Sequence, residues 1–199
     1  MTPATLPRPR PTTTPPWQAP SNAPPAKLLT LVLPRAPGKV LLGLKKRGFG
    51  TGFWNGFGGK VEATDASVAA AAARELQEEC GLTALDLRRC GTLNFHWEEQ
   101  PQAWEVAVYN CTQWTGEIVE SDEMLPQWTA TDSLPFDRMW PDDRHWYPFF
   151  LDGTPFEGTF WFRNTTELVQ FIIAPTTEEA LQIADRKDHR AHLPAVTAR

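Results

Sequence analysis

One short segment with three glutamates constrains this chain more than any other feature of its sequence. Residues 68–79 contain no glycine or proline and are rich in Ala, Leu, Glu and Gln, so they predict a helix. Gly81 follows, at the position where a left-handed residue commonly ends a helix. Glu75, Glu78 and Glu79 are spaced i, i+3 and i+4, which places their carboxylates on one helix face. The polar residues that could begin the helix are Thr64, Asp65 and Ser67.

The three carboxylates indicate a site for a divalent cation. Like charges at this spacing repel one another unless a cation neutralises them. Magnesium suits such a face, because it takes oxygen ligands and is commonly shared between carboxylates and substrate phosphates. Arg74 lies four residues before Glu78 and is placed to form an ion pair with it. A solvated acidic helix face is the alternative for such a cluster taken alone.

Length and composition limit the classes of protein to be considered. A chain of 199 residues, 41% hydrophobic, can bury one core with tails. The net charge of -5 argues against a binder of duplex nucleic acid or of a membrane surface, since both need a cationic face. A free nucleotide needs only a local basic site. The cysteines, Cys80, Cys90 and Cys111, form no CxxC pair and indicate reduced thiols, so we expect a cytoplasmic protein, with the nucleus and mitochondria left open.

The chain divides into three regions by composition. Residues 1–26 are dominated by Pro, Thr and Ala and predict a disordered tail. A transit peptide is the alternative, although the repeated prolines oppose the amphipathic helix of such signals. We expect residues 27–175 to form the ordered domain and residues 176–199 a helical extension with a frayed end.

The pattern of the ordered region predicts a mixed α/β domain. The runs LLTLVL and VLLGL, at residues 28–33 and 40–44, predict two strands joined by a turn. Further strands are predicted at residues 92–97, 105–111, 158–163 and 168–174, with short helical pieces between them. A last helix is predicted at residues 177–186, with fraying from Lys187.

The sequence RELQEECGL, from Arg74 to Leu82, is the second half of a known signature. That signature is a Gly, five residues, a Glu, seven residues, then Arg-Glu, an aliphatic residue, any residue, Glu-Glu, any residue, Gly and an aliphatic residue. Gly58 and Gly59 supply the preceding loop. On these positions the chain resembles the Nudix hydrolase family.

One departure from the signature concerns the junction between this loop and the helix. The interval from Gly59 to Arg74 is one residue longer than the pattern, so the family's first Glu falls at Asp65 or Ala66. That Glu mainly braces the junction in the family. We expect Asp65 to take its place.

The resemblance implies an α/β (α+β) Nudix fold, with a mixed β-sheet core sandwiched between helices. It also implies that Mg²⁺, with Mn²⁺ as a substitute, is held on a polyphosphate while water attacks a phosphorus atom. The implied metal ligands are the carbonyl of Gly58 and the carboxylates of Glu75, Glu78, Glu79 and Glu123. The implied catalytic residues are Arg74, Glu78 and Glu79. Glu79 is the expected main ligand, whereas Glu123 taken alone could be a solvated loop acid.

Four longer motifs narrow the resemblance to the family members that hydrolyse 8-oxo-dGTP and 2-hydroxy-dATP. They are LLGLKKRGFG, WNGFGGKV, VESDEM and PFDRMWPDD, beginning at Leu41, Trp54, Val119 and Pro135. The resemblance covers about residues 28–174. The positions that it implies for substrate binding are Thr30, Lys45, Phe49, Asn55, Phe95, Met124, Trp140, Asp142 and Asp143.

The same residues suit a purine on chemical grounds. A purine needs flat apolar faces, which Phe49, Phe95 and Trp140 could supply, and polar groups at its edge. Asp142 and Asp143, if drawn into one apolar pocket, would repel, so that one could stay protonated and donate a hydrogen bond. Taken singly, Trp140 could be a core aromatic and the aspartates a turn or helix cap. The pocket wall departs from the family at three positions. His96, Trp97 and Trp104 are bulkier or more polar than the residues that usually follow the Phe95 position.

We therefore expect a monomeric hydrolase that converts oxidised purine nucleoside triphosphates to the monophosphate and pyrophosphate, with a nucleotide as its small-molecule partner. One alternative is a Nudix hydrolase of another substrate, such as a methylated purine triphosphate, a dinucleotide or a cap. A second alternative is a non-catalytic Nudix-fold binding module. The intact glutamate set argues against the second.

Overall fold

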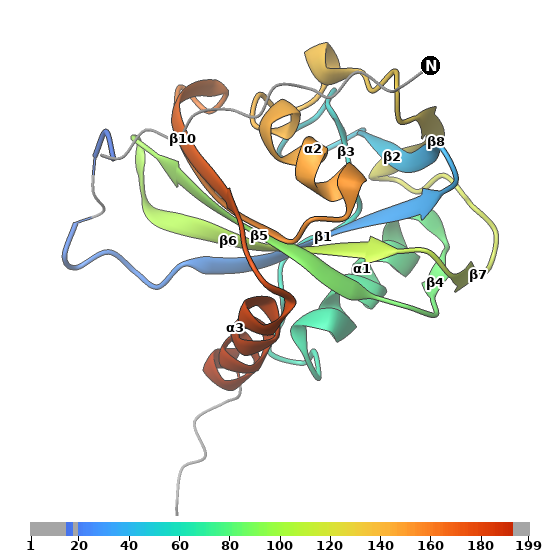
Figure 1. Cartoon of the computed structure of the whole chain (residues 1–199), viewed down its shortest axis with the longest axis horizontal. Coiled ribbons are helices and arrows are strands. Elements are labelled where there is room, and N and C mark those ends of the chain that lie inside the picture. The colour runs from blue at the N-terminus through green and yellow to red at the C-terminus, as the bar shows by residue number, and fades with distance from the viewer. Residues whose placement is uncertain (1–14, 18–19, 193–199) are drawn as a thin grey trace, which may run out of the picture.

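The computed structural model describes residues 15–17 and 20–192. Most of the predicted tail, residues 1–14 and 18–19, and the last residues, 193–199, lie outside the described residues. The rest forms one mixed sheet with helices on both of its faces (Figure 1). The expected mixed β-sheet core between helices is confirmed.

The main sheet has eight strands in the order β10-β9-β5-β6-β1-β2-β3, with β8 paired to β2. Two pairings are parallel, β1 with β6 and β5 with β9, and the other pairings are antiparallel. The strands are β1 (Lys27–Ala36), β2 (Lys39–Lys45), β3 (Trp54–Asn55), β5 (Arg88–Trp97), β6 (Gln100–Cys111), β8 (Met124–Ala130), β9 (Phe156–Arg163) and β10 (Glu167–Pro175). A separate small sheet pairs β4 (Thr83–Ala84) with β7 (Trp114–Thr115).

The helix that carries the glutamates, α1 (Val68–Cys80), begins and ends where the sequence predicts. The Ser67 hydroxyl accepts a hydrogen bond from the Ala70 N–H at 3.0 Å, which satisfies one of the free donors of the first turn. Gly81 adopts φ 79° and its N–H donates to the Gln77 carbonyl, which closes the last turn. These two contacts set where α1 begins and ends.

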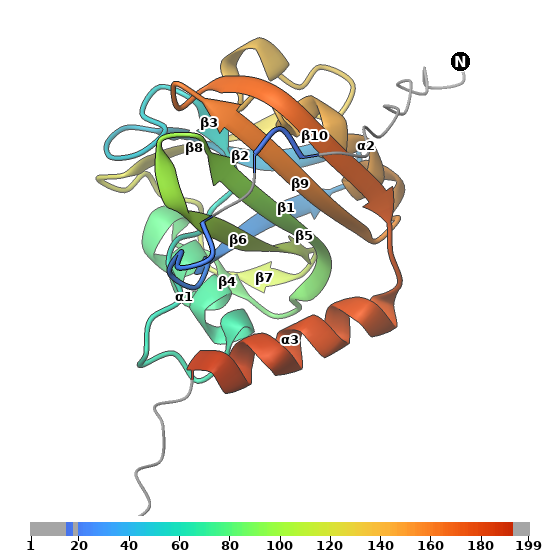
Figure 2. The same cartoon turned by 90° about the vertical axis from the view of Figure 1, so that its left-hand side faces the viewer.

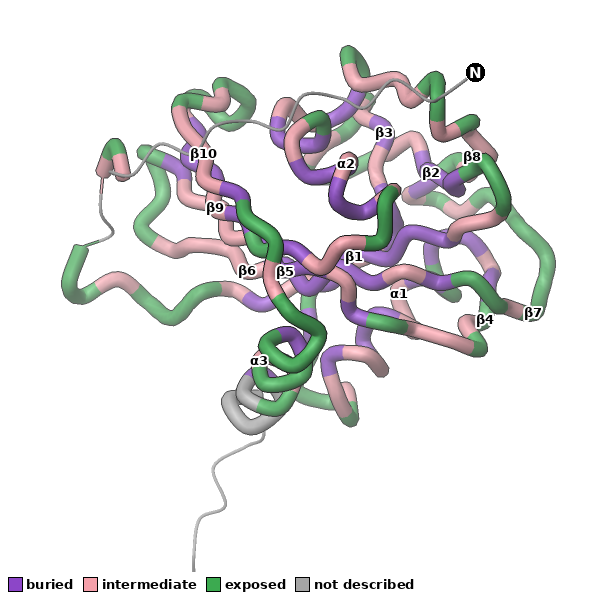
Figure 3. Tube along the Cα trace, viewed as in Figure 1, coloured by how far each residue is buried: buried purple, intermediate pink, exposed green. Residues whose placement is uncertain are grey.

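Two apolar cores lie on the two faces of the sheet. α1 packs over one face through buried residues that include Ala72 and Leu76. α2 (Asp143–Asp152) packs over the other through large aromatic residues that include Trp146 and Phe150. Figure 3 shows the buried residues along the central strands and in α2. A short 3-10 helix, Phe136–Arg138, precedes α2.

The C-terminal helix α3 (Glu178–His192) lies beside the sheet on the same side as α1 (Figure 2). The Arg89 guanidinium, whose side chain is only 2% exposed, donates to Asp185 and Asp188 at 2.8 Å each. The Tyr109 hydroxyl donates to Asp185 at 3.0 Å. These contacts hold α3 against the sheet: the helix runs to His192, past the predicted end at residue 186, and Asp188 is buried against Arg89.

The sequence pattern did not predict strand β8, which pairs with β2 along its whole length. Pro126 lies within it and lowers the strand signal, because proline cannot donate to a ladder and is confined to edges. β8 pairs with no other strand in the described part of the chain, so the missing donor is tolerated. Among the described helices, none has the length and apolar character needed to cross a bilayer.

Candidate active site

A cavity of about 460 Å³ opens between the central strands, the glycine-rich loop that follows β2, and the start of α2. The structure brings every residue predicted to bind substrate to its wall: Thr30, Lys45, Phe49, Asn55, Phe95, Met124, Trp140, Asp142 and Asp143. Gly58 and Glu123, two of the predicted metal ligands, also line it. The Thr30 hydroxyl is buried and has no hydrogen-bond partner among the described residues, which leaves it available to a ligand.

Two adjacent, buried carboxyl groups form part of the cavity wall. Asp142 and Asp143 are 3% and 2% exposed. Asp142 accepts a hydrogen bond from the Trp146 indole N–H at 3.0 Å, and Asp143 accepts one from the Trp140 backbone N–H at 2.9 Å. Asp142 occupies the N-cap position of α2, as the helix-cap alternative has it, but its side chain makes no capping hydrogen bond. The hydrogen bond from the Trp140 N–H to Asp143 is the kind of contact that the turn alternative describes. Asp143 makes this contact and also lines the cavity.

Burial changes the acidity of this pair. Burial raises the pKa of Asp142 to about 7, against the opposing effect of the Trp146 hydrogen bond. Burial, and then the neighbouring charge of Asp142, raise the pKa of Asp143 well above its ordinary value. Each carboxyl therefore keeps a proton to a higher pH than an exposed aspartate does, and a protonated carboxyl can donate a hydrogen bond as well as accept one.

Aromatic rings form another part of the cavity wall. The Phe49 ring stacks on Trp140 with a centroid distance of 5.0 Å and an interplanar angle of 17°. Phe53 approaches Trp140 at 5.0 Å as well, tilted by 39°. Gly50 permits this approach, because a Cβ there would lie 3.0 Å from the Trp140 ring and the residue adopts φ +82°. These rings offer flat surfaces of the kind on which a base can stack.

The departures in the pocket wall fall into two groups. Trp97 and Trp104 line the cavity, and their ring centroids lie 4.8 Å apart. His96 does not line the cavity, so the expectation that it belongs to the pocket wall is wrong. It stacks on Trp161 at 5.6 Å instead, because successive side chains of a strand point to opposite faces of the sheet.

Sequence reasoning missed several wall residues, among them two aromatic residues of the cavity. Phe162 lines the cavity from β9, and Trp146 lines it from α2. The two-residue period of β9, in which Phe160 and Phe162 share a face, would have indicated the first. The spacing of four between Asp142 and Trp146 on one helix would have indicated the second.

The carboxylates of α1 lie in unlike surroundings. Glu79 is buried, and its second carboxylate oxygen accepts the Gly58 N–H at 2.8 Å. Glu75 lies against the glycine loop so closely that a Cβ on Gly59 would be 2.6 Å from its carboxylate oxygen. Glu78 is exposed and accepts a hydrogen bond from Arg74 at 3.1 Å. Only Glu75 and Glu79 therefore approach the loop that lines the cavity.

The acidity of the two inner glutamates reflects this crowding. Burial raises the pKa of Glu79, although the hydrogen bonds from Lys45 and Gly58 act in the opposite direction. Burial likewise raises the pKa of Glu75, against the hydrogen bond and charge of Arg74. A bound cation would relieve the cost of these partly desolvated charges.

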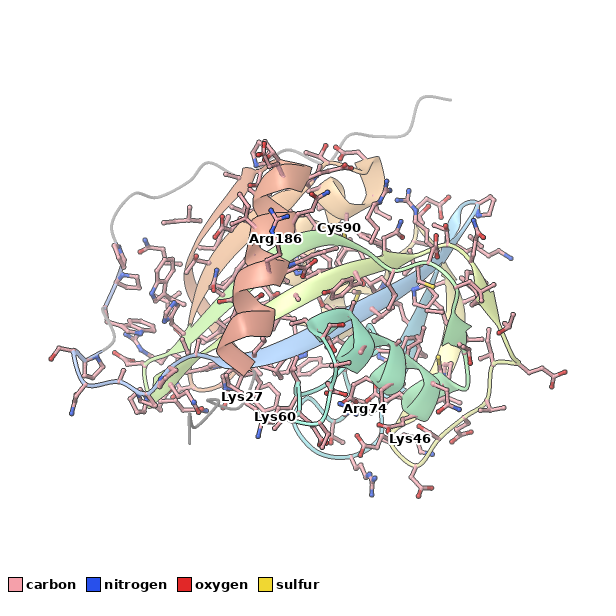
Figure 4. All side chains as sticks on the ribbon, turned by 90° about the horizontal axis from the view of Figure 1, so that it is seen from below. Lys27, Lys46, Lys60, Arg74, Cys90 and Arg186 are labelled. Atoms are coloured by element: carbon pink, nitrogen blue, oxygen red, sulfur yellow. The ribbon has the colours of Figure 1, made fainter. Side chains whose placement is uncertain are left out.

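Arg74 braces the junction between loop and helix. Its guanidinium donates two hydrogen bonds to Asp65, both at 3.0 Å, and a third to Glu75 at 2.9 Å. It also donates to the Lys60 carbonyl at 3.2 Å. Asp65 thus makes the bracing contact expected of it in place of a glutamate. Figure 4 labels Arg74 with Lys60, Lys27 and Lys46 along one edge of the molecule.

Lys45 joins the carboxylates of α1 to the cavity. Its ammonium group lies 2.9 Å from Glu79 and 2.9 Å from Glu123, which itself accepts from Arg47 at 2.8 Å. Burial lowers the pKa of Lys45, but the hydrogen bonds and charges of Glu79 and Glu123 outweigh it, so the pKa lies above its ordinary value. In the described part of the chain, no three His, Cys, Asp or Glu side chains converge closely enough to hold a metal ion.

The donor set nevertheless fits a hard divalent ion. Glu75, Glu79 and Glu123 offer only oxygen atoms, which Mg²⁺ and Mn²⁺ prefer. Glu79 and Glu123 already converge on one positive charge, that of Lys45. The glycine at position 59 leaves room for the Glu75 carboxylate beside the loop.

Comparison with known proteins agrees with this geometry. Residues 28–150 match the family model described as the NUDIX domain. The chain is 47% identical over 145 residues to the oxidized purine nucleoside triphosphate hydrolase of Danio rerio, covering 73% of this chain and 92% of that protein. The enzyme of the same name from Mus musculus is 41% identical over 146 residues, with 73% and 93% covered.

Solved structures share the fold. The MutT protein from Bacillus halodurans superposes with a TM-score of 0.66 and 25% sequence identity, covering 76% of this chain and 99% of that one. The family model matches more than half of the chain, and the two curated relatives are matched over nearly their whole length. The chain therefore belongs to the NUDIX domain family.

Proposed function

We propose that this protein hydrolyses oxidised purine nucleoside triphosphates, with 8-oxo-dGTP and 2-hydroxy-dATP as the type substrates, to the monophosphate and pyrophosphate. One observation carries the proposal: two adjacent, buried carboxyl groups, Asp142 and Asp143, line a cavity together with aromatic side chains. The names of the two curated relatives support the same substrate class.

The carboxyl pair can read an altered base edge. An ionised Asp only accepts hydrogen bonds, whereas a protonated Asp both donates and accepts. Because the pKa of each is raised, the pair can hold one proton on either carboxyl and so present more than one donor and acceptor pattern. The Asn55 amide, also in the cavity wall, adds a fixed donor and acceptor. Trp140 and Phe49 supply the stacking faces.

Hydrolysis is assigned to the carboxylates of α1 and to the neighbouring Glu123 and Gly58. Glu79 is the proposed main metal ligand, with Glu75, Glu78, Glu123 and the Gly58 carbonyl as the further ligands. A bound Mg²⁺ or Mn²⁺ would neutralise the polyphosphate and lower the pKa of the attacking water. Arg74 holds Glu75 and Glu78 by hydrogen bonds and so orients both carboxylates on the helix. The buried Glu79 keeps its orientation through the Gly58 N–H.

The proposed substrate is tested by a panel of nucleotides with pyrophosphate detection. The panel contains 8-oxo-dGTP, 2-hydroxy-dATP, dGTP, an O6-methylated and an N6-methylated purine triphosphate, a dinucleotide and a cap analogue. The proposal requires the highest kcat/KM for an oxidised purine. A higher value for a methylated purine, dinucleotide or cap would assign the enzyme to that alternative substrate, and no turnover of any member would indicate a binding module.

Three further expectations complete the proposal. The folded unit is proposed to span residues 27–175 with α3 as an extension, and residues 1–26 to be dispensable for hydrolysis. The protein is proposed to act as a monomer in the cytoplasm. Light scattering and imaging of a tagged full chain test the last two expectations.

A further inference from the structure

Lys45 occupies the point at which two proposed metal ligands converge. It belongs to the end of β2, whereas Glu79 belongs to α1 and Glu123 to the loop before β8. The ammonium group is 2.9 Å from one oxygen of each carboxylate and its side chain is only 16% exposed. An ammonium group at this point is therefore held by two charge-assisted hydrogen bonds in a mostly desolvated setting.

Both oxygens of Glu79 are engaged in this arrangement. One accepts from Lys45 and the other from the Gly58 N–H. Its side chain is only 5% exposed, so solvent offers it little further contact. Each carboxylate oxygen can accept a further contact, but the ammonium group occupies the point at which Glu79 and Glu123 converge, so a metal ion that bridges the two carboxylates would take its place. The Gly58 N–H belongs to the backbone beside β1, whereas the lysine has a flexible four-carbon side chain, so Lys45 is the donor that can leave.

We propose that Lys45 is a resident counter-ion that competes with the divalent metal for Glu79 and Glu123. Its positive charge stabilises the paired carboxylates until a metal ion arrives, and the metal then displaces the ammonium group from them. This inference rests on the proposed metal-dependent function, and it adds a positioning role for a residue outside the ligand set.

The displaced ammonium group remains within the active site. Lys45 lines the same cavity as Asn55 and Trp140, so its released charge faces the space assigned to the nucleotide. A free ammonium group has three N–H donors and pairs readily with phosphate oxygens. Metal binding to the carboxylates therefore makes a cationic group available to the substrate, which couples the two binding events.

The experiment measures Mn²⁺ binding to the full chain without nucleotide, using the electron paramagnetic resonance signal of free Mn²⁺. The variants Lys45→Met and Lys45→Gln remove the competing charge, and Lys45→Arg keeps it. Lys46→Met is the matched control, because Lys46 pairs with Glu120 at 2.6 Å on the surface. Glu79→Gln assigns the binding to this site.

The proposal predicts that Lys45→Met and Lys45→Gln bind Mn²⁺ about tenfold more tightly than the wild type, a coupling of ordinary size. Lys45→Arg and Lys46→Met are expected to stay within about twofold of the wild type. Mn²⁺ should also raise the melting temperature of Lys45→Met more than that of the wild type, since it replaces the lost counter-ion. The rise in melting temperature tests the proposal even for a variant that folds poorly without metal.

Two results separate the inference from the function on which it rests. In the first result, the wild type binds Mn²⁺, Glu79→Gln abolishes this binding, and both neutral Lys45 variants bind Mn²⁺ no more tightly than the wild type. This result would overturn the role of Lys45 and leave the metal site standing. Failure of the wild type to bind Mn²⁺ at all, or binding that Glu79→Gln leaves unchanged, would overturn the proposed metal site and this inference with it.

Discussion

Asp142 accepts a hydrogen bond from the indole N–H of Trp146, one turn further along the same helix segment, at 3.0 Å. Asp142 lines the cavity, and the Trp146 ring belongs to the apolar core beneath α2, so the bond links the cavity wall to the core. The orientation of the base-reading pair is thus tied to the packing of the helix against the sheet. Substitutions in this pair are expected to act on substrate choice more than on metal binding.

The first prediction concerns the main carboxylate. Glu79→Gln should lower kcat by about 100- to 1,000-fold, because it removes a charge that holds the cation on the polyphosphate. The fold should be kept, since an amide oxygen can still accept from Gly58, but the melting temperature should fall, because Lys45 loses a buried charged partner. Pyrophosphate release with and without a chelator measures this. Glu120→Gln, on the exposed surface, is the control, and full wild-type activity in chelator would contradict the mechanism.

The second prediction concerns the brace between loop and helix. Asp65→Asn should lower the free energy of unfolding by about 1–2 kcal/mol, because Arg74 loses its charged, two-point partner. Urea denaturation measures the loss. Asp137→Asn is the control, since Asp137 is exposed and lies 3.4 Å from Arg144. Equal effects of the two substitutions would show that the brace is only a surface ion pair.

The third prediction concerns pH. The pKa values of Asp142 and Asp143 are raised, so the folded pair binds protons more tightly than the unfolded chain does. The stability from this pair is fully present below the ordinary Asp pKa of 3.8 and is lost as pH rises through the raised values, to about 7 for Asp142.

Asp143→Asn tests this sign, because it removes one titrating group and keeps an oxygen that can accept from the Trp140 N–H. As the pH rises from about 4 to about 8, the free energy of unfolding of the wild type should fall relative to that of the variant. A constant difference over that range would mean that the pair is ionised like exposed aspartates.

The fourth prediction concerns α3. Asp188→Asn should destabilise the protein by about 1–3 kcal/mol, because Arg89 is buried and loses one of its charged partners. Hydrolysis at low temperature should be retained, since Asp188 does not line the cavity. Glu178→Gln, which removes an exposed pair with Arg88 at 3.9 Å, should have little effect on the melting temperature. An equal melting temperature for Asp188→Asn and wild type would argue that α3 is not held by Arg89.

Much of the fold follows from local sequence signals. The limits of α1 were predictable because Ser67 and Gly81 have side-chain and backbone properties that act within one turn. Strand β8 was not, since Pro126 weakens the local pattern and the strand is defined by its pairing with β2. The length of α3 likewise depends on Arg89, which is distant in the chain.

In the candidate site, too, some features follow from local sequence and others depend on distant contacts. The residues of the cavity wall were predictable as a set, because four contiguous motifs carry most of them. The side to which His96 points was not, since it depends on how β5 lies in the sheet. The bridge from Lys45 to Glu79 and Glu123 has no local signal either, because it joins three separate elements.

The most direct test of the central claim is the ratio of kcat/KM for 8-oxo-dGTP to that for dGTP, in the wild type and in Asp142→Asn and Asp143→Asn. An unpaired buried polar group costs about 1–3 kcal/mol, so each variant should change the ratio by roughly 5- to 150-fold. The ratio for 2-hydroxy-dATP should change by a different factor, because the Asn amide fixes one donor and acceptor pattern. If kcat/KM for all three substrates fell by one common factor, the aspartate pair would be structural and would not read the base.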